Sequence, residues 1–488
     1  MRKHVLSLGF VGSLLLILTG CGSTTQITNG TNGGGLTGSV AIFGTDAPLC
    51  DVFSFQVTIS GATLTPANGG APVSVITSAN PITVDFARLQ DFGNLLQLSS
   101  VPTGTYSQLN LTLSAPQLWV LDVTQSPPAP VQVSNVSLTT SRVSITLQPQ
   151  LMITEGKSSG LMMDFNLQSS VQTDANGQVT GVVDPVFRAG MTMQSTADGV
   201  GRADDLHGVV QSVSTTSSNA AFTGSFTLQV FGGAGPVFTI NTTSTTRFEG
   251  VTGLSGLSQS AFAEVDSHVD TSGNIIADAV EVEDSDPVST QRAAFLGRVI
   301  SVTRDLTGAA TQFTIVVAEE FPDLEQTVPL RSPLTVTVSG TTFYAIGRPA
   351  FNEAGLNFNA KAIGVAETVV ARGLIQSGPP VTLNAGAVVL RPRTVLGHFS
   401  TLLAAAGDGK TGGFTMIPCG SLFQGSAVNV LTFNDTIFDG FSSLAQLGPQ
   451  PLLGARGLVI YQQTPGSANG ASWTAPTWVL ESHYVHQH

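Results

Sequence analysis

The sequence predicts an all-β protein, with an N-terminal β-sandwich followed by about three small β-barrel-like repeat units. Only 10% of the 488 residues are charged, and glycine alone accounts for 53 of them. Thr, Ser, Val and Gly are abundant, which favours strands and turns over helices. Short segments alternate apolar and polar residues with a period of two, and the second half of the chain resembles itself at regular intervals.

The N-terminus has the pattern of a secretory signal. Arg2 and Lys3 precede an apolar run over residues 5–18, which is shorter than the roughly 20 residues that span a bilayer. The run ends in Leu-Thr-Gly-Cys at residues 18–21, which resembles a bacterial lipobox. This resemblance implies that residues 1–20, the signal helix, are removed and that the thiol of Cys21 receives a diacylglyceryl group. The alternative is an ordinary cleaved signal followed by an unrelated cysteine.

The segment after the signal and the overall charge limit location and partners. Residues 21–37, rich in Gly, Ser, Thr and Asn, are expected to form a flexible tether. Gly22 follows the cysteine, so an outer-membrane or cell-surface destination is expected. The net charge of −13 repels phosphate backbones, which argues against nucleic acid as a partner. Contact with the membrane is therefore expected through the lipid.

The first folded domain, a β-sandwich, is expected over residues 38–193. Segments 39–43, 53–59 and 108–113 alternate apolar and polar residues and are bounded by turn-forming residues, as half-buried strands are. Four motifs follow in order: Thr45-Asp46-Ala47-Pro48, Val84-Asp85-Phe86, Val101-Pro102-Thr103-Gly104 and Leu161-Met162-Met163-Asp164-Phe165. In order and spacing they resemble domain-of-unknown-function family 4382, which is common in bacterial surface lipoproteins. The family has no assigned activity, so the resemblance implies none.

Three repeat units are expected over residues 206–284, 295–392 and 395–485. Each opens on a glycine, continues with a Phe-Thr-apolar strand, and later has a threonine followed by a phenylalanine. The glycines are Gly208, Gly297 and Gly397, and the later motifs are Thr246-Arg247-Phe248, Thr342-Phe343 and Thr436-Ile437-Phe438. This pattern resembles domain-of-unknown-function family 5666, thought to be a small β-barrel, with the first copy matching best.

Candidate site residues are few. Gly-x-Ser-x-Gly, His-Glu-x-x-His and Cys-x-x-Cys motifs do not occur, so no catalytic residue and no cofactor are predicted. Asp46, Asp85 and Asp164 can supply an acid/base pair or a calcium site, or they can accept backbone hydrogen bonds in turns. His483, His486 and His488 can share a divalent metal, or they can belong to a solvated tail.

Cysteine usage leaves one further pairing open. Export permits a disulfide between Cys50 and Cys419, and the alternative is two separate thiols. The function expected from these features is a non-enzymatic array of modules that binds a glycan or another envelope protein. The alternatives are an envelope hydrolase that uses carboxylates of the sandwich and a structural spacer.

Overall fold

The computed structural model describes residues 35–487, except for short gaps at 48, 90–92, 123, 127, 176–177, 193–198, 231–234, 285–291, 322–323, 325, 348–350 and 449–451. Cys21 and His488 therefore lie outside the described residues, as does the signal. Strands make up 63% of the structure and helices 4%, which confirms the all-β prediction. In the part of the chain described, no helix is long and apolar enough to cross a membrane.

The N-terminal domain is a sandwich of two main sheets. Its elements are β1 (Thr37–Ala47), β2 (Val52–Pro66), β3 (Val73–Ile76), β4 (Ile82–Asp85), η1 (Phe86–Arg88), β5 (Asn94–Pro102), β6 (Gly104–Asp122), β7 (Ala129–Gln132), β8 (Ser137–Leu138), β9 (Arg142–Ile153), β10 (Ser158–Asn166), α1 (Leu167–Ser170), β11 (Val171–Thr173), β12 (Val179–Val183) and β13 (Phe187–Met191). One sheet has the order β13-β10-β1-β5, and the other joins β3, β2, β6 and β7, with β4 on β2 and β9 on β6. Alternate residues of both sheets fill the core, where the rings of Phe55 and Phe165 stack at 5.1 Å.

Three barrels follow. The first contains β14 (Gly201–Ser214), β15 (Gly224–Val230), β16 (Val237–Thr242), β17 (Arg247–Glu249), η2 (Leu254–Gly256), β18 (Phe262–Val269) and β19 (Ile275–Asp284). The second contains β20 (Arg292–Arg304), β21 (Ala310–Phe321), β22 (Pro333–Thr337), β23 (Phe343–Ile346), β24 (Thr368–Gln376) and β25 (Thr382–Arg391). The third contains β26 (Arg393–Ala405), β27 (Gly412–Pro418), η4 (Ser421–Phe423), β28 (Val428–Asp439), η5 (Leu444–Gln446), β29 (Leu452–Gln462), β30 (Gly466–Ala468), β31 (Ala471–Trp473) and β32 (Thr477–Gln487).

All three barrels share one topology. In the third, the closed order is β26-β27-β28-β32-β29, and its third strand, β28, lies parallel to the last, β32. The first barrel closes in the same way through the parallel pair β16–β19, and the second through β22–β25. Closure removes exposed strand edges, so each unit forms its own small core.

The repeated threonines have the same role in every barrel. Each hydroxyl donates to a carbonyl of the last strand and accepts the backbone N–H three residues earlier. The donated bonds are Thr246 to Ala277 (2.7 Å), Thr342 to Ala385 (2.9 Å) and Thr436 to Ser482 (2.9 Å), and the accepted N–H groups belong to Thr243, Ser339 and Phe433. The hydroxyl therefore fixes the turn after the third strand in the first two barrels and the register shift within β28 in the third.

The repeated glycines allow close strand pairing. A Cβ atom at Gly208, Gly297 or Gly397 would lie within 2.6 Å of a carbonyl oxygen of the second strand, which is closer than any real contact. The first strand of each barrel therefore requires glycine at this position.

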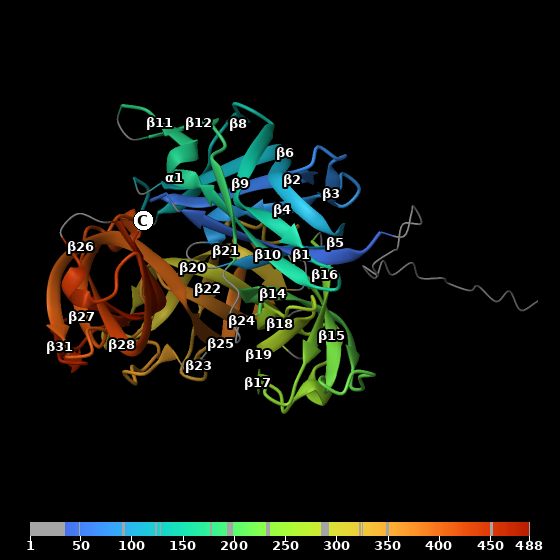
Figure 1. The fold of residues 1–488 in the computed structure, drawn as a ribbon. Coiled ribbons are helices and arrows are strands. Elements are labelled where there is room, and N and C mark those ends of the chain that lie inside the picture. Colours follow the sequence, from blue (N-terminus) through green and yellow to red (C-terminus); the bar gives the residue numbers. More distant parts are fainter. Residues whose placement is uncertain are drawn as a thin grey trace, which may run out of the picture.

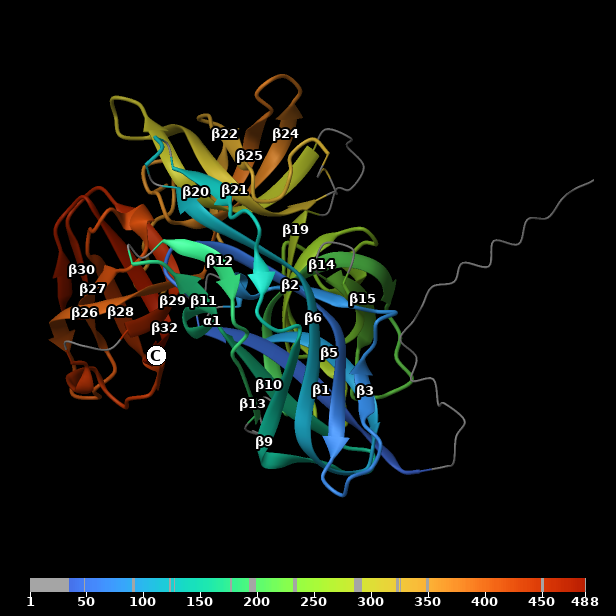
Figure 2. The same ribbon diagram turned by 90° about the horizontal axis from the view of Figure 1, so that it is seen from above.

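The four domains pack together as one body (Figures 1 and 2). In Figure 1 the sandwich lies at the top, the third barrel at the left and the first barrel at the lower right, with the second barrel between them. Phe43 of the sandwich packs in the core of the first barrel, and Phe53 packs in that of the third. A disulfide joins Cys50 to Cys419, with 5.7 Å between their Cα atoms. Of the two alternatives left open by the sequence, the structure contains the disulfide.

Candidate functional site

A cavity of about 160 Å³ lies where the four domains meet. A volume of this kind has room for on the order of ten water molecules, or for one small ligand. Its charged walls come from every domain: Asp85 and Arg88 from the sandwich, Glu264 from the first barrel, Arg298, Glu319, Arg331 and Arg391 from the second, and Arg393 and Arg456 from the third. The packing of the domains, rather than any one domain, creates the site.

The cavity concentrates positive charge in an acidic protein. Its lining contains six arginines and three carboxylates, although the chain as a whole carries a net charge of −13. Two of these arginines belong to the short segment Arg391-Pro392-Arg393, which joins the last strand of the second barrel to the first strand of the third. A cavity with low-dielectric walls and one sign of charge focuses its field and attracts ligands of the opposite sign.

Some of these arginines are neutralised by carboxylates of other domains. Arg88 forms an ion pair with Glu319. Burial alone raises the pKa of Glu319, but the charges of Arg88 and His207 outweigh it, so the pKa lies below its usual value. Arg391 Nη1 lies 3.0 Å from Glu264. These pairs join the domains across the cavity.

Arg331 is held by the sandwich. Its Nε donates to Ser54 Oγ at 3.2 Å, and its guanidinium lies 4.4 Å from the ring centre of Trp119. Ser54 in turn donates to a carboxylate oxygen of Asp85 at 2.5 Å, and the Phe55 N–H donates to the other oxygen at 2.9 Å. Asp85 therefore orients Arg331 through a hydroxyl and has both oxygens engaged.

Arg298 contacts an aromatic ring and, within the described part of the chain, has an unsatisfied donor. Its guanidinium lies 5.4 Å from the ring centre of Phe53, and its buried Nε has no hydrogen-bond partner among the residues described. Burial lowers the pKa of Arg298 to about 10, with Asp85 opposing this effect and Arg88 adding to it. A buried guanidinium with an unsatisfied donor is costly, and an oxyanion would supply the missing acceptor.

Arg393 faces the same electrostatic cost. Its Nε donates to the Thr394 carbonyl at 3.1 Å and its Nη1 to the Ala366 carbonyl, and both of these acceptors are neutral. Burial, followed by the charge of Arg298, holds the pKa of Arg393 well below its usual value. Two buried guanidinium groups that repel one another are stabilised when an anion lies between or beside them.

The three predicted carboxylates are not brought together. Asp85 lines the cavity. Asp46 lies opposite Phe165 across the β1–β10 pair, whereas Asp164 lies opposite Thr45, so these two carboxylates project from opposite faces of the sheet. The Leu167 N–H donates to Asp46 Oδ1 at 3.2 Å, so Asp46 has a structural role as a backbone acceptor.

The predicted histidines also separate. His483 Nδ1 lies 3.3 Å from Asp435, and His486 Nδ1 lies 3.0 Å from Asp439. The register of β32 shifts at His483, and the two histidines have different acidic partners, so among the residues described they do not share one group of ligands. The arginines of the cavity were not predicted from the sequence. The one pattern that could have indicated them is Arg391-Pro392-Arg393, two close arginines in a chain with only 19 lysines and arginines.

These features define a four-domain, all-β protein with a shared basic cavity. Residues 37–180 match a family described as Domain of unknown function (DUF4382), so the N-terminal domain is similar to this family, as predicted. No curated protein matches the chain. One solved structure, drosophila Unr CSD456, is similar over 59% of this chain and 98% of its own, with 7% identity and a TM-score of 0.15.

Proposed function

We propose that this protein is an exported, lipid-anchored envelope protein that binds a small anionic ligand in its central cavity. The observation that carries the proposal is the buried pair Arg298 and Arg393, which face a cavity lined by twice as many arginines as carboxylates. Guanidinium groups offer paired N–H donors that match carboxylate, phosphate or sulfate oxygens. The ligand class is therefore a small molecule that bears one of these groups, including an acidic sugar.

Binding without chemical conversion is favoured by the state of the cavity carboxylates. Asp85 is held by Ser54 and by a backbone N–H, Glu264 by Arg391, and Glu319 by Arg88. Carboxylates held in this way neutralise arginines and are poorly placed to act as general bases. This supports the binding function over the hydrolase alternative.

Calorimetry on a tag-free soluble form that lacks the lipidated cysteine, residues 22–488, tests the anion site. The probes are inorganic phosphate, sulfate and galacturonate at low ionic strength. We expect saturable binding of at least one probe, and at least tenfold weaker binding in Arg298→Met. Arg142→Met is the matched control, because Arg142 is exposed on β9, away from the cavity. Absence of binding by all three probes, or equal binding by wild type and a folded Arg298→Met, would overturn the proposal.

The lipid anchor is tested separately in a bacterial host. Residues 18–21 and the polar segment that leads to β1 support an acyl group on Cys21. Labelled palmitate should be incorporated into wild type and not into Cys21→Ser, and only wild type should sediment with membranes. Equal sedimentation of both would contradict anchoring through this cysteine.

A further inference from the structure

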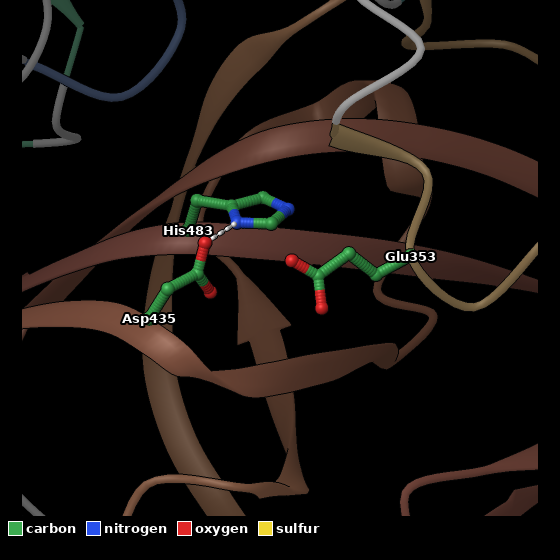
Figure 3. A group of neighbouring side chains, drawn as sticks. All are labelled: Glu353, Asp435 and His483. Carbon is green, nitrogen blue, oxygen red and sulfur yellow. Dashed lines mark hydrogen bonds and ion pairs between the residues drawn. The ribbon is translucent and has the colours of Figure 1, made fainter.

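Three ligand-bearing side chains meet at the junction of the second and third barrels (Figure 3). Glu353 lies in the loop between β23 and β24, Asp435 lies on β28, and His483 lies on β32. One ligand atom of each lies within 4.8 Å of the others. The carboxylates of Glu353 and Asp435 are exposed, so small side-chain rotations can bring them closer.

The ring of His483 is fixed in orientation. It stacks on Phe433 with ring centres 5.2 Å apart, and the edge of Phe351 meets it at 4.7 Å. Its Nε2 lies 3.3 Å from the Phe351 carbonyl oxygen, which can only accept, so Nε2 carries the proton. A histidine that ligates a metal donates its other ring N–H to a carbonyl or carboxylate in this way.

The other ring nitrogen, Nδ1, lies next to the Asp435 carboxylate. Nδ1 lies 3.3 Å from Asp435 Oδ2, which also only accepts, so this contact requires either a second proton or a metal ion between the two atoms. A nitrogen lone pair and carboxylate oxygens repel one another unless a cation lies between them. Figure 3 shows the carboxylates of Asp435 and Glu353 on the same side of the ring.

A buried carboxylate next to this group holds the loop that carries Glu353. Glu481 lies two residues before His483 on β32 and is fully buried. Its Oε2 accepts the Ala354 N–H at 3.0 Å, and its Oε1 has no hydrogen-bond partner in the part of the chain that is described. Glu481 therefore holds the loop that carries Glu353 against the third barrel.

We propose that Glu353, Asp435 and His483 form a binding site for a divalent transition-metal ion, with Zn²⁺ as the best fit. One imidazole nitrogen and two carboxylate oxygens are typical ligands of Zn²⁺, with water at the remaining position, whereas Ca²⁺ takes oxygen ligands. Tetrahedral ligands about 2.0–2.2 Å from zinc lie about 3.4 Å apart, which the two exposed carboxylates reach by rotation. The ion joins the loop of the second barrel to two strands of the third.

Zinc titration of the same tag-free soluble form, stripped of metal, tests this site. The free metal is buffered by a fluorescent chelator, and binding is read from competition and from the shift in Tm. We expect one Zn²⁺ per chain, a higher Tm on binding, and no competition from a hundredfold excess of Ca²⁺. His483→Gln and Asp435→Asn should each weaken binding at least tenfold.

The chain supplies a matched control on the same strand. His486 and Asp439 form a similar pair, but among the residues described no third ligand joins them. His486→Gln should therefore leave zinc affinity unchanged. Glu353→Gln changes an exposed side chain and keeps the test informative if His483→Gln fails to fold. Arg298→Met should bind zinc normally, which separates this site from the anion cavity.

Three results would overturn the proposal. They are the absence of stoichiometric zinc binding by wild type, equal weakening by His483→Gln and His486→Gln, and NMR evidence that His483 is an imidazolium whose signals zinc leaves unchanged. The last result would mean that a second proton, rather than a metal, lies between Nδ1 and Asp435.

Discussion

Arg391 and Glu264 form an ion pair between two barrels, with 3.0 Å between the guanidinium and the carboxylate. Their side chains are only 3% and 2% exposed, and the same guanidinium nitrogen lies 2.6 Å from Glu281. A buried charge that loses its partner is strongly destabilising, whereas a buried pair as a whole contributes little net stability. The pair therefore fixes how the first two barrels dock.

Removal of the arginine alone should destabilise the protein. Arg391→Met leaves Glu264 buried without this partner, and we expect about 3–5 kcal/mol of lost stability, measured by urea denaturation. The double variant Arg391→Met/Glu264→Gln should recover part of this loss, because Glu264, the more deeply buried of the two carboxylates that lose Arg391, is then neutral. If the double variant is as unstable as the sum of both single variants, the two residues are not coupled.

The disulfide should stabilise the assembly of the first and last domains. Cys50 and Cys419 are separated by 369 residues, so the bond closes a very long loop in the unfolded chain. Reduction, or Cys50→Ser with Cys419→Ser, should cost about 2–5 kcal/mol and lower the Tm. Before reduction, neither thiol should react with iodoacetamide in the denatured protein. Labelling of both cysteines without reductant would show that the bond is absent.

Local patterns predicted the fold because each strand and each barrel carries its own signal. The alignment of Thr246, Thr342 and Thr436 rested on spacing within a repeat, and the structure assigns all three the same hydrogen bonds. The resemblance of these barrels to family 5666 stays a prediction. The N-terminal domain was recognised from motifs that lie within one domain.

The sites could not be predicted in the same way because they form between domains. Arg88, Arg298 and Arg393 come from three domains, and no local period indicates which faces will pack together. For the proposed zinc site, the sequence analysis named His483 but placed it together with His486 and His488. The fold gives His486 a different acidic partner, Asp439, and brings Asp435, 48 residues away, and Glu353 next to His483.

The repeated threonine should be essential to each barrel. Thr436 is fully buried, and its hydroxyl joins the Phe433 N–H to the Ser482 carbonyl. Thr436→Val keeps the shape but leaves both groups unsatisfied, so we expect a loss of about 1–3 kcal/mol. Thr436→Ser retains the hydroxyl and should be much less destabilising. Comparable losses in the Val and Ser variants would assign the effect to packing instead of hydrogen bonding.

Glu367 should make stability fall as pH rises. Its carboxylate is fully buried between the second and third barrels, where it accepts the Gly364 and Tyr461 N–H groups at 2.9 and 2.8 Å. Burial raises its pKa well above 4.5, an effect that these two hydrogen bonds and the charge of Arg304 only partly offset. The folded state therefore binds the proton more tightly than the unfolded state does.

The sign of the pH dependence follows from this difference. The contribution of Glu367 is fully present below the unfolded pKa and is lost as pH rises through the folded pKa. Tm should therefore decline with pH above 4.5 more steeply in wild type than in Glu367→Gln, which cannot ionise. Thermal melts of both proteins between pH 4 and 8 measure the difference between the two slopes. Parallel profiles would show that folding leaves the pKa of Glu367 unchanged, because only a group whose protonation changes with folding can alter the slope.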